Sequence, residues 1–412
     1  MQRRIAHFFK LHCFRKFLVR FFILGICTSF SSVSFAQTVV TQAATAGQPA
    51  ATPDYAPVDH AGKPWRIAYI ETRPFANYTA TLVNMITALH QMGWIKSIDD
   101  LPYKKGQVDS KVIWDWLAQQ ENGPYLKFMA DDFFTFDNVK KEKLDGYANS
   151  IYERLDRSKE VDLILIMGTE AAEKIATRPL SIPMMSMSTS NAMQAGIVQG
   201  AEFSGKDQVW AHMDPYRYKR QIDIFYDIFK FKTLGVVYDD DTAGRSYAAI
   251  YDVLEVATER QFKVVIENVS QPQKYSAQNK KKFATDLEAA FARLAPKVDA
   301  VYLGLFIGND PADLAKELSP LTQRKIPVFA QQSNDVAGGA LMSLARQNFA
   351  GVGRFNARAM VRILKGESPA KVRQIYENSP NIIINLDVAK EIAYRPRFDL
   401  LLGADQLVKA PK

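Results

Sequence analysis

Short hydrogen-bonding side chains follow several of the apolar runs in this sequence. Gly168 and Thr169 stand directly after one such run, and the segment Ser188–Asn191 stands directly after the next. A glycine allows a tight turn, and a threonine can cap the following helix while backbone N–H groups remain free for an acceptor such as a carboxylate. The pattern predicts hydrogen bonds to a small polar molecule. The alternative is a plain helix cap that binds no ligand.

Further candidate residues follow the other apolar runs in the same way. The ring of Phe75 could stack on a ligand or fill the core, and neutral amides would give a polar, uncharged wall. For each of them, ordinary loop polarity is the alternative. The predicted ligand-binding residues are Glu71, Thr72, Phe75, Asn77, Gly168, Thr169, Ser190, Asn191, Ser246, Asn309, Gln331 and Asn348.

The residues that catalysis or metal binding would need form no recognisable pattern. His60, His90 and His212 stand far apart, and no His-Glu-x-x-His, Gly-x-Ser-x-Gly or phosphate-loop motif occurs. The three aspartates at 239–241 lack the alternating oxygen ligands, central glycine and distal glutamate of an EF-hand. We therefore predict no catalytic residue, no metal and no cofactor. An enzyme whose groups converge from distant positions remains an alternative.

One order of elements occurs twice along the chain. A short apolar strand at 66–70 precedes a helix with apolar residues at 82, 85, 86 and 89, and a strand at 234–238 precedes a similar helix. In both halves a strand that opens with Val-Asp and a strand that opens with Ile-Pro come next. This alternation predicts an α/β fold of two doubly wound parallel-sheet lobes joined by a hinge.

The first half is longer than the second, and the excess falls near 99–130. A predicted helix at 110–120 carries Trp114 and Trp116 there, which we expect to cover the lobe surface, with contact to a partner as the alternative. The predicted division is a signal peptide at 1–36, a flexible leader at 37–63, a first lobe at 64–205 with an insertion at 99–130, a second lobe at 206–338, a return to the first lobe at 339–365, and a C-terminal crossing segment at 366–412.

The first 36 residues have the features of a secretory signal. Six Lys or Arg residues precede a short apolar stretch at 21–30, and small residues stand at Ser34 and Ala36. The stretch is about half of the roughly 20 residues that a membrane-spanning helix needs. We predict cleavage after Ala36 and a periplasmic location. An uncleaved anchor is the alternative, whereas lipidation of Cys27 is disfavoured because Ile26 is too bulky for a lipobox.

Cleavage changes what the composition implies. The formal net charge of +8 includes those six cationic residues, so the remaining chain carries about +2 (8 − 6) and has no nucleic-acid signature. Cys13 and Cys27 are the only cysteines, and both would leave with the signal. A chain without cysteine suits an oxidising compartment and excludes thiol catalysis.

Residues 64–408 resemble the substrate-binding proteins of ABC importers, whose better-known members bind aromatic or other amino acids. The resemblance implies a type I periplasmic-binding fold, a ligand held in the cleft between lobes, and an ABC permease as partner. The segments that carry it are Gly168–Ala172, Ile182-Pro183, Ala195–Val198, Ile326–Ala330, Ile363–Pro369, Ile383–Lys390 and Leu400-Leu401.

Two positions depart from the pattern of that family. Asn191 stands where comparable members have the aspartate of Ser-Asp-Pro, and Asn348 stands where they have the aspartate of Asp-Tyr. Aspartates there would favour an ammonium group through charge-assisted hydrogen bonds. If these asparagines reach the ligand, the neutral replacements weaken the case for an amino acid.

The sequence thus predicts a monomeric periplasmic solute-binding component of an ABC importer that closes on a small molecule. The alternative is a periplasmic sensor subunit that hands its ligand-bound surface to a membrane receptor, because the same fold serves both tasks. The neighbouring genes discriminate between the two roles.

Overall fold

The structure is a computed structural model that describes residues 54–272, 276–306, 309, 311–344, 348–377 and 381–409. The predicted signal peptide at 1–36 and the predicted leader up to residue 53 lie outside the described residues. No helix in the described part of the chain is long and apolar enough to cross a membrane.

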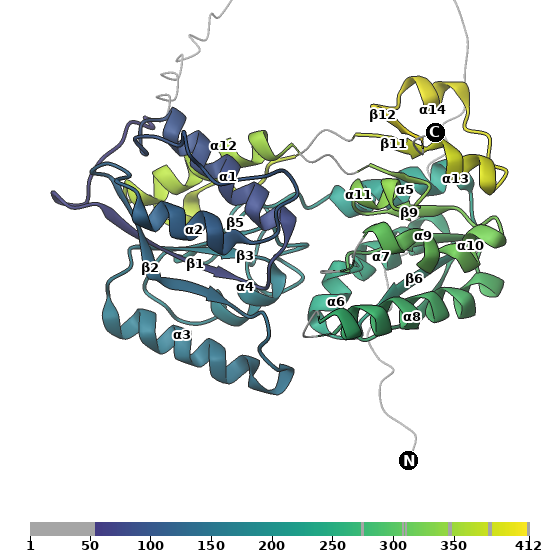
Figure 1. Cartoon of the computed structure of the whole chain (residues 1–412), viewed down its shortest axis with the longest axis horizontal. Coiled ribbons are helices and arrows are strands. Elements are labelled where there is room, and N and C mark those ends of the chain that lie inside the picture. The colour runs from purple at the N-terminus through teal and green to yellow at the C-terminus, as the bar shows by residue number, and fades with distance from the viewer. Residues whose placement is uncertain are drawn as a thin grey trace, which may run out of the picture. The chain divides into compact units, whose positions relative to one another are not determined.

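The first lobe is built on a five-stranded parallel sheet with strand order β2-β1-β3-β4-β5 (Figure 1). Along β1, Ile67 and Tyr69 pack on one side of the sheet, whereas Ala68 and Ile70 pack on the other. This alternation follows from the two-residue repeat of a strand, and it explains why the run is apolar throughout. The strands are β1 (Trp65–Glu71), β2 (Leu126–Thr135), β3 (Leu163–Met167), β4 (Met184–Met187) and β5 (Val209–Ala211).

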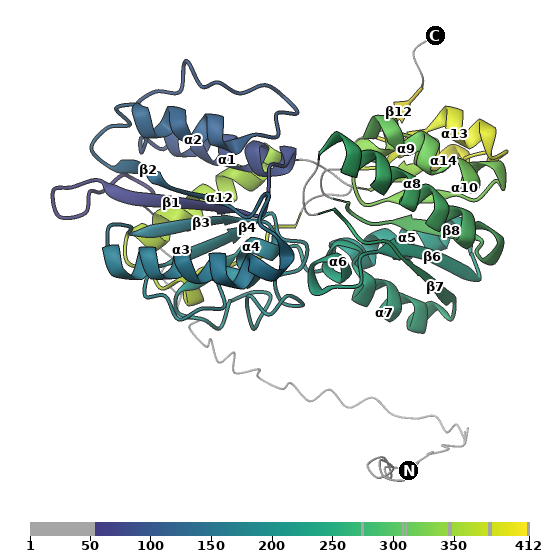
Figure 2. The same cartoon turned by 60° about the horizontal axis from the view of Figure 1, so that its bottom comes forward.

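Helices cover both faces of this sheet (Figure 2). The core that contains Ile67 and Tyr69 includes residues of three helices, and the core that contains Ala68 and Ile70 includes residues of two others. The first group is α1 (Ala76–Gln91), α2 (Ser110–Gln119) and α12 (Phe349–Leu364), and the second is α3 (Leu144–Ser158), which follows a 3-10 turn at Lys141–Lys143, and α4 (Thr169–Ile175).

The second lobe has a seven-stranded sheet with order β12-β11-β10-β9-β8-β6-β7. Only the β10–β11 pair is antiparallel. The strands are β6 (Thr233–Tyr238), β7 (Lys263–Asn268), β8 (Ala300–Leu303), β9 (Val328–Ala330), β10 (Met342–Ser343), β11 (Ile383–Asn385) and β12 (Gln406–Val408).

This sheet is likewise packed between two apolar layers. One layer holds α5 (Arg217–Phe229), α7 (Ile250–Arg260), α13 (Leu386–Glu391) and α14 (Phe398–Leu402), and the other holds α8 (Ala277–Leu294), α9 (Pro311–Glu317) and α10 (Ser319–Gln323). A 3-10 turn at Ala295–Lys297 follows α8. Two short helices, α6 (Thr242–Tyr247) and α11 (Asn334–Ala337), follow β6 and β9. The predicted α/β fold of two doubly wound lobes is confirmed.

Two details differ from the predicted division of the chain. β5 begins at Val209, after the predicted boundary at residue 205, and pairs with β4, so the first sheet ends later than expected. β10 lies in the predicted return segment 339–365 but pairs with β9 of the second sheet, so only α12 returns to the first lobe. In both cases a short strand is added to a sheet by backbone pairing, for which sequence periodicity gives no signal.

The described part of the leader, residues 54–63, contacts the first lobe through its backbone. The carbonyl of Tyr55 accepts the indole N–H of Trp94 at 2.9 Å, and the carbonyl of Val58 accepts that of Trp65 at 3.0 Å. Buried indoles need such acceptors, and a segment of low hydrophobicity can supply them through its backbone. These two contacts hold Tyr55 and Val58 against the first lobe, and the flexibility of the leader stays a prediction.

The insertion contributes to the core of the first lobe. Trp114 of α2 is fully buried, packs against Tyr69 and Phe128, and donates its indole N–H to the Met129 carbonyl at 3.0 Å. Trp116 is half-buried against the same core. Trp114 is therefore neither a surface cover nor a docking residue.

The chain crosses between the two sheets three times, after β5, after β10 and before β11. The first and third crossings are joined, because the N–H of Met213 donates to the Gln374 carbonyl and the N–H of Tyr376 donates to the Met213 carbonyl, both at 2.9 Å. The amide of Asn348, at the end of the second crossing, donates to the Tyr376 hydroxyl at 3.4 Å. These residues form the connection between the lobes.

Candidate functional site

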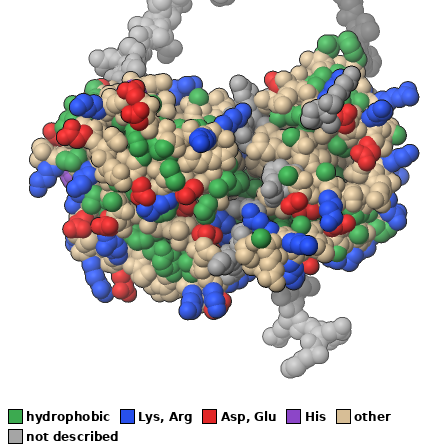
Figure 3. All heavy atoms as spheres, viewed as in Figure 1, with side chains coloured by type: hydrophobic (Ala, Val, Ile, Leu, Met, Phe, Trp, Pro, Cys, Tyr) green, Lys and Arg blue, Asp and Glu red, His purple; other side chains and the backbone are tan. Residues whose placement is uncertain are grey.

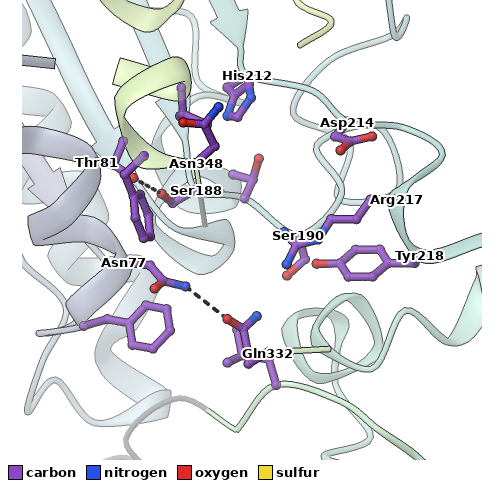
Figure 4. Close-up of a pocket in the computed structure, with 15 residues that line it drawn as sticks. Asn77, Thr81, Ser188, Ser190, His212, Asp214, Arg217, Tyr218, Gln332 and Asn348 are labelled. Atoms are coloured by element: carbon purple, nitrogen blue, oxygen red, sulfur yellow. Dashed lines mark hydrogen bonds between the residues drawn. The ribbon is translucent and has the colours of Figure 1, made fainter. Parts of the chain in front are cut away.

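A cavity of about 110 Å³ lies where the lobes and the crossing segments meet (Figure 4). Parallel sheets place ligands beyond the carboxyl ends of their strands, and most of the lining residues follow such ends. The lining consists of Phe75, Asn77, Thr81, Ser188, Thr189, Ser190, His212, Asp214, Arg217, Tyr218, Leu305, Gln332, Asn348, Phe349 and Val352.

The start of α1 supplies an aromatic ring and an amide to this cavity. Phe75 has extended backbone at the position before the helix, and its ring packs edge-on against Tyr78 with centroids 5.2 Å apart. Asn77 donates from its side-chain amide to Oε1 of Gln332 at 3.2 Å, and Figure 4 shows this bond. Because Gln332 belongs to the second lobe, the bond links the two sides of the cavity.

The loop after β4 supplies three hydroxyl-bearing residues. Ser188 adopts a left-handed backbone with φ of 53°, and its hydroxyl lies 3.0 Å from that of Thr81 (Figure 4). The N–H of Ser190 donates to Oγ1 of Thr169 at 3.1 Å. These bonds fix the loop, and the remaining hydrogen-bonding capacity of its hydroxyls can serve a ligand.

His212 lines the cavity in its neutral form. Burial lowers the pKa of the imidazole to about 4; the Arg217 cation lowers it further, and the Tyr376 backbone opposes the shift. The ring lies beside those of Phe355 and Tyr376, with centroids 5.9 and 6.1 Å away. Its Nε2 is buried and has no hydrogen-bond partner in the described part of the protein.

The start of α5 brings one paired and one unpaired charge to the cavity. Asp214 accepts a hydrogen bond from Arg220 at 2.9 Å. Arg217 stacks its guanidinium on the Tyr218 ring at 5.2 Å, and no hydrogen bond or ion pair holds it within the described residues. Among the described lining residues, Arg217 is thus a cation without an ion-pair partner.

Asn348 closes the cavity from the second crossing. Its side-chain oxygen accepts from the Gly351 N–H at 3.1 Å and so caps α12, while its amide nitrogen faces the Tyr376 hydroxyl. Phe349 and Val352, on the first turns of the same helix, add apolar surface.

A larger cavity of about 500 Å³ adjoins the first. The two share Phe75, Asn77, Leu305 and Gln332, so the Asn77–Gln332 hydrogen bond stands between them. Gly106 and Val108 of the insertion and Asn309 after β8 line the second cavity only. The insertion therefore reaches the cleft, a position that the sequence pattern did not predict.

Five of the twelve predicted ligand-binding residues line these cavities. Phe75, Asn77, Ser190 and Asn348 line the first, and Asn309 lines the second, where its amide donates to Glu317 at 2.9 Å. All five follow strand ends or begin helices, as their positions in the sequence predicted. Their contact with a ligand stays a prediction.

Glu71 is one of the predicted residues that the structure places elsewhere. Its carboxyl group is buried in the first lobe and accepts from the Tyr69 hydroxyl at 3.0 Å. Burial raises the pKa of this carboxyl to about 7, against smaller lowering contributions from hydrogen bonds to Tyr69 and Ser110. Glu71 is the last residue of β1, and its side chain points into the core instead of the cleft.

Gly168, Thr169 and Thr72 also serve the structure of the first lobe. A Cβ on Gly168, whose φ is 93°, would overlap the Tyr78 hydroxyl. The hydroxyl of Thr72 accepts from the Ala171 N–H at 3.1 Å and satisfies the start of α4. Thr169 is thus not the predicted cap. It instead orients the loop that holds Ser190.

Three further predicted residues lie outside both cavities. The side chain of Asn191 accepts from the N–H groups of Met193 and Gln194 and closes a local turn. Ser246 is buried on α6. Gln331 is fully buried beside β9, and strand alternation directs its neighbour Gln332 to the cavity instead.

His212, Asp214 and Arg217 are the main residues that the sequence analysis missed. All three stand where β5 gives way to α5, and β5 was not predicted because it is only three residues long. A His followed two residues later by Asp and then by Arg is a usable signal only once that strand end is known. Within the described residues, no group of three or more His, Cys, Asp or Glu could hold a metal ion.

Two parallel α/β sheets, three crossings and a cavity lined from both sides define a type I periplasmic-binding fold. The family model described as ABC transporter substrate binding protein matches residues 131–408, and the chain belongs to this family. The chain is also similar to a curated tyrosine-binding protein of Clostridioides difficile, with 20% identity over 73% of this chain and 75% of that protein.

Solved structures agree on the fold. A domain from Streptococcus pneumonia in complex with L-Trp matches with a TM-score of 0.61 at 16% identity, and a conserved domain protein from Vibrio cholerae matches with 0.60 at 18%. A ligand-free, open substrate-binding protein with adhesive properties from Clostridium difficile gives 0.55 at 20%. Each match covers 84% of this chain and all of the other.

Proposed function

We propose that this protein is the periplasmic solute-binding component of an ABC importer, that it is not an enzyme, and that it binds a small molecule between its lobes. The observation that carries the proposal is the cavity to which both lobes and the crossing segments contribute side chains. A ligand there would contact Asn77 on one lobe and Arg217 on the other, and its binding free energy would favour the closed arrangement.

The family supports transport, and the chemistry of the cavity supports binding without reaction. Its hydroxyl and amide groups can donate or accept hydrogen bonds, whereas the neutral His212 has no carboxylate or hydroxyl hydrogen-bonded to it in the described residues. The tyrosine-binding relative and the tryptophan complex support an organic ligand of amino-acid size. The predicted signal peptide supports export.

A thermal-unfolding screen of the full chain against amino acids, small carboxylic acids and nucleobase-like compounds tests ligand binding. A true ligand at a hundred times its Kd should stabilise the protein by about 2.7 kcal/mol. Ser190→Trp should fill the cavity and abolish the shift, whereas Ser150→Trp on the exposed face of α3 should preserve it. A screen without any shift, or a shift that survives Ser190→Trp, would contradict binding in this cavity.

Uptake measurements distinguish transport from sensing. If neighbouring genes encode a permease and an ATPase, cells that lack this protein should lose uptake of the identified ligand. Neighbouring genes for a membrane kinase or cyclase, with uptake unchanged, would instead favour the sensor role.

A further inference from the structure

We infer that the ligand carries an anionic group, such as a carboxylate, and no ammonium group, and that Arg217 selects it. This inference rests on the proposed function and names the ligand class of the same cavity.

Arg217 has no hydrogen-bonded or ionic partner among the described residues. Its guanidinium lies at the first turn of α5, where the positive end of the helix dipole adds to its charge. Within the described residues its guanidinium stacks on the Tyr218 ring, and its N–H groups donate no hydrogen bond there. In Figure 4 the side chain extends among the other lining residues. An unpaired guanidinium offers a fork that a carboxylate can engage with two hydrogen bonds.

Asp214 is the acidic residue among the described lining residues, and it already has a cationic partner. Asp214 is paired with Arg220, and only 9% of its side chain is exposed. Glu377 also approaches Arg220, at 3.5 Å, but it lies outside the cavity and more than half of its side chain is exposed, so water screens its charge. Among the described lining residues, an ammonium group would therefore meet Arg217 without a free carboxylate to balance it.

The remaining polar groups of the lining carry no charge. Asn348 offers an amide that already caps α12, and the hydroxyls of Ser188 and Ser190 are neutral. His212 is neutral as well, and its buried Nε2 lacks a partner, so it can exchange one hydrogen bond with a ligand. Neutral donors and acceptors can bind the body of an anion, but they do not compensate the charge of an ammonium group.

The size of the cavity limits the class further. A volume of 110 Å³ suits a compact molecule. Phe75 and Phe349 provide ring surface on its wall. A compact monocarboxylate with an apolar or aromatic body matches both the volume and the lining.

Calorimetric titration of the full chain with matched compounds tests the inference. The pairs are phenylpropionate with L-phenylalanine, hydroxyphenylpropionate with L-tyrosine, and methylpentanoate with L-leucine; phenethylamine supplies the amine without a carboxylate. We expect at least one acid to bind more tightly than its amino acid, and phenethylamine not to bind. Arg217→Gln should weaken the best acid at least about 30-fold, the loss expected when a buried charge partner is removed.

Lys219→Gln is the matched control. It removes one positive charge from the same helix, but Lys219 pairs with Glu255 and Glu259 on the surface and does not line the cavity. We expect the affinity of Lys219→Gln to stay within a factor of two of the wild type. Tighter binding of the amino acids, binding of none of the acids, or equal loss in the two variants would overturn the inference. Binding of amino acids alone would still leave the proposed function standing, whereas no ligand in the wider screen would remove that function too.

Discussion

The two sides of the cavity differ in charge. The first-lobe side is lined by neutral groups, among them Asn77, Ser188 and Ser190, and each makes a hydrogen bond, that of Asn77 reaching Gln332 of the second lobe. The second-lobe side presents Arg217, which has no fixed hydrogen bond in the described residues. The difference suggests a division of labour in which one lobe fixes the shape of the site and the other supplies the charge that a ligand completes.

The largest loss of stability should come from a substitution in the first lobe at the turn that contains Gly168. Gly168→Ala should lower the free energy of unfolding by about 3–5 kcal/mol, because a Cβ would overlap the Tyr78 hydroxyl and φ is positive. Gly196→Ala is the control, since its φ of 69° costs about 1–2 kcal/mol but no atom lies near the new Cβ. Urea denaturation of both variants measures the difference. Equal losses would show that the crowding at Gly168 has no energetic effect.

The next largest effect should be a change of stability with pH, caused by Glu71, which is buried in the first lobe. Its pKa is about 7 in the folded protein and near 4.5 when unfolded, so the folded state binds the proton more tightly. Stability should therefore fall as pH rises from 4.5 to 7, by up to about 3 kcal/mol.

Glu71→Gln should remove that fall, and denaturation of both proteins at several pH values measures it. Both proteins keep His212, whose lowered pKa has the opposite effect on stability. The stability that His212 contributes is fully present above pH 6.5 and is lost as pH falls toward 4. The difference between the two curves therefore isolates Glu71. Parallel curves for the two proteins would contradict the raised pKa.

The loop that carries Ser190 should respond to a smaller change. Thr169→Val removes the hydroxyl that accepts the Ser190 N–H and should cost about 1–3 kcal/mol of stability, along with ligand affinity. Thr169→Ser keeps the acceptor and should restore most of both quantities. If valine and serine behave alike in denaturation and titration, the hydrogen bond does not position the loop.

The smallest effect should come from the ion pair that joins the two lobes at Lys141 and Asp241, 2.7 Å apart. Lys141→Met should change stability by at most about 1 kcal/mol, because the lysine is largely exposed. This variant leaves Asp241 free to accept the Gly244 N–H and cap α6. The difference from the wild type should vanish in high salt. A larger loss, or one that salt does not reduce, would mean that the pair controls how the lobes approach.

Long and strongly periodic elements were predictable from the sequence. The strands at β1 and β6 and the helices that follow them have apolar spacing that only one type of packing satisfies. The loop after β1 supplied Phe75 and Asn77, which the structure places in the lining of the first cavity, and their contact with a ligand stays a prediction. The same order of elements in the second half led to the prediction of Ser246 as a ligand-binding residue, but the structure places Ser246 outside both cavities. The loop after β6 has the same topological place as the loop after β1, but it lines neither of the cavities described above.

The charged residues of the site were not predictable in the same way. Arg217 and Asp214 follow a three-residue strand, and the pairing of Asp214 with Arg220 depends on how α5 leaves the crossing segment. Gln332 and Gln331 differ by one position, and only the register of β9 decides which of them reaches the cavity. Such features depend on tertiary pairing, which local patterns do not encode.

A crystal structure of the full chain with its best-binding ligand would show whether an anionic ligand binds at Arg217. We expect ligand density in the cavity between Asn77, Ser190 and Arg217, with an acidic oxygen within hydrogen-bond distance of the Arg217 guanidinium. Density at any other place on the protein, or a ligand in this cavity whose cationic group faces Arg217, would contradict this expectation.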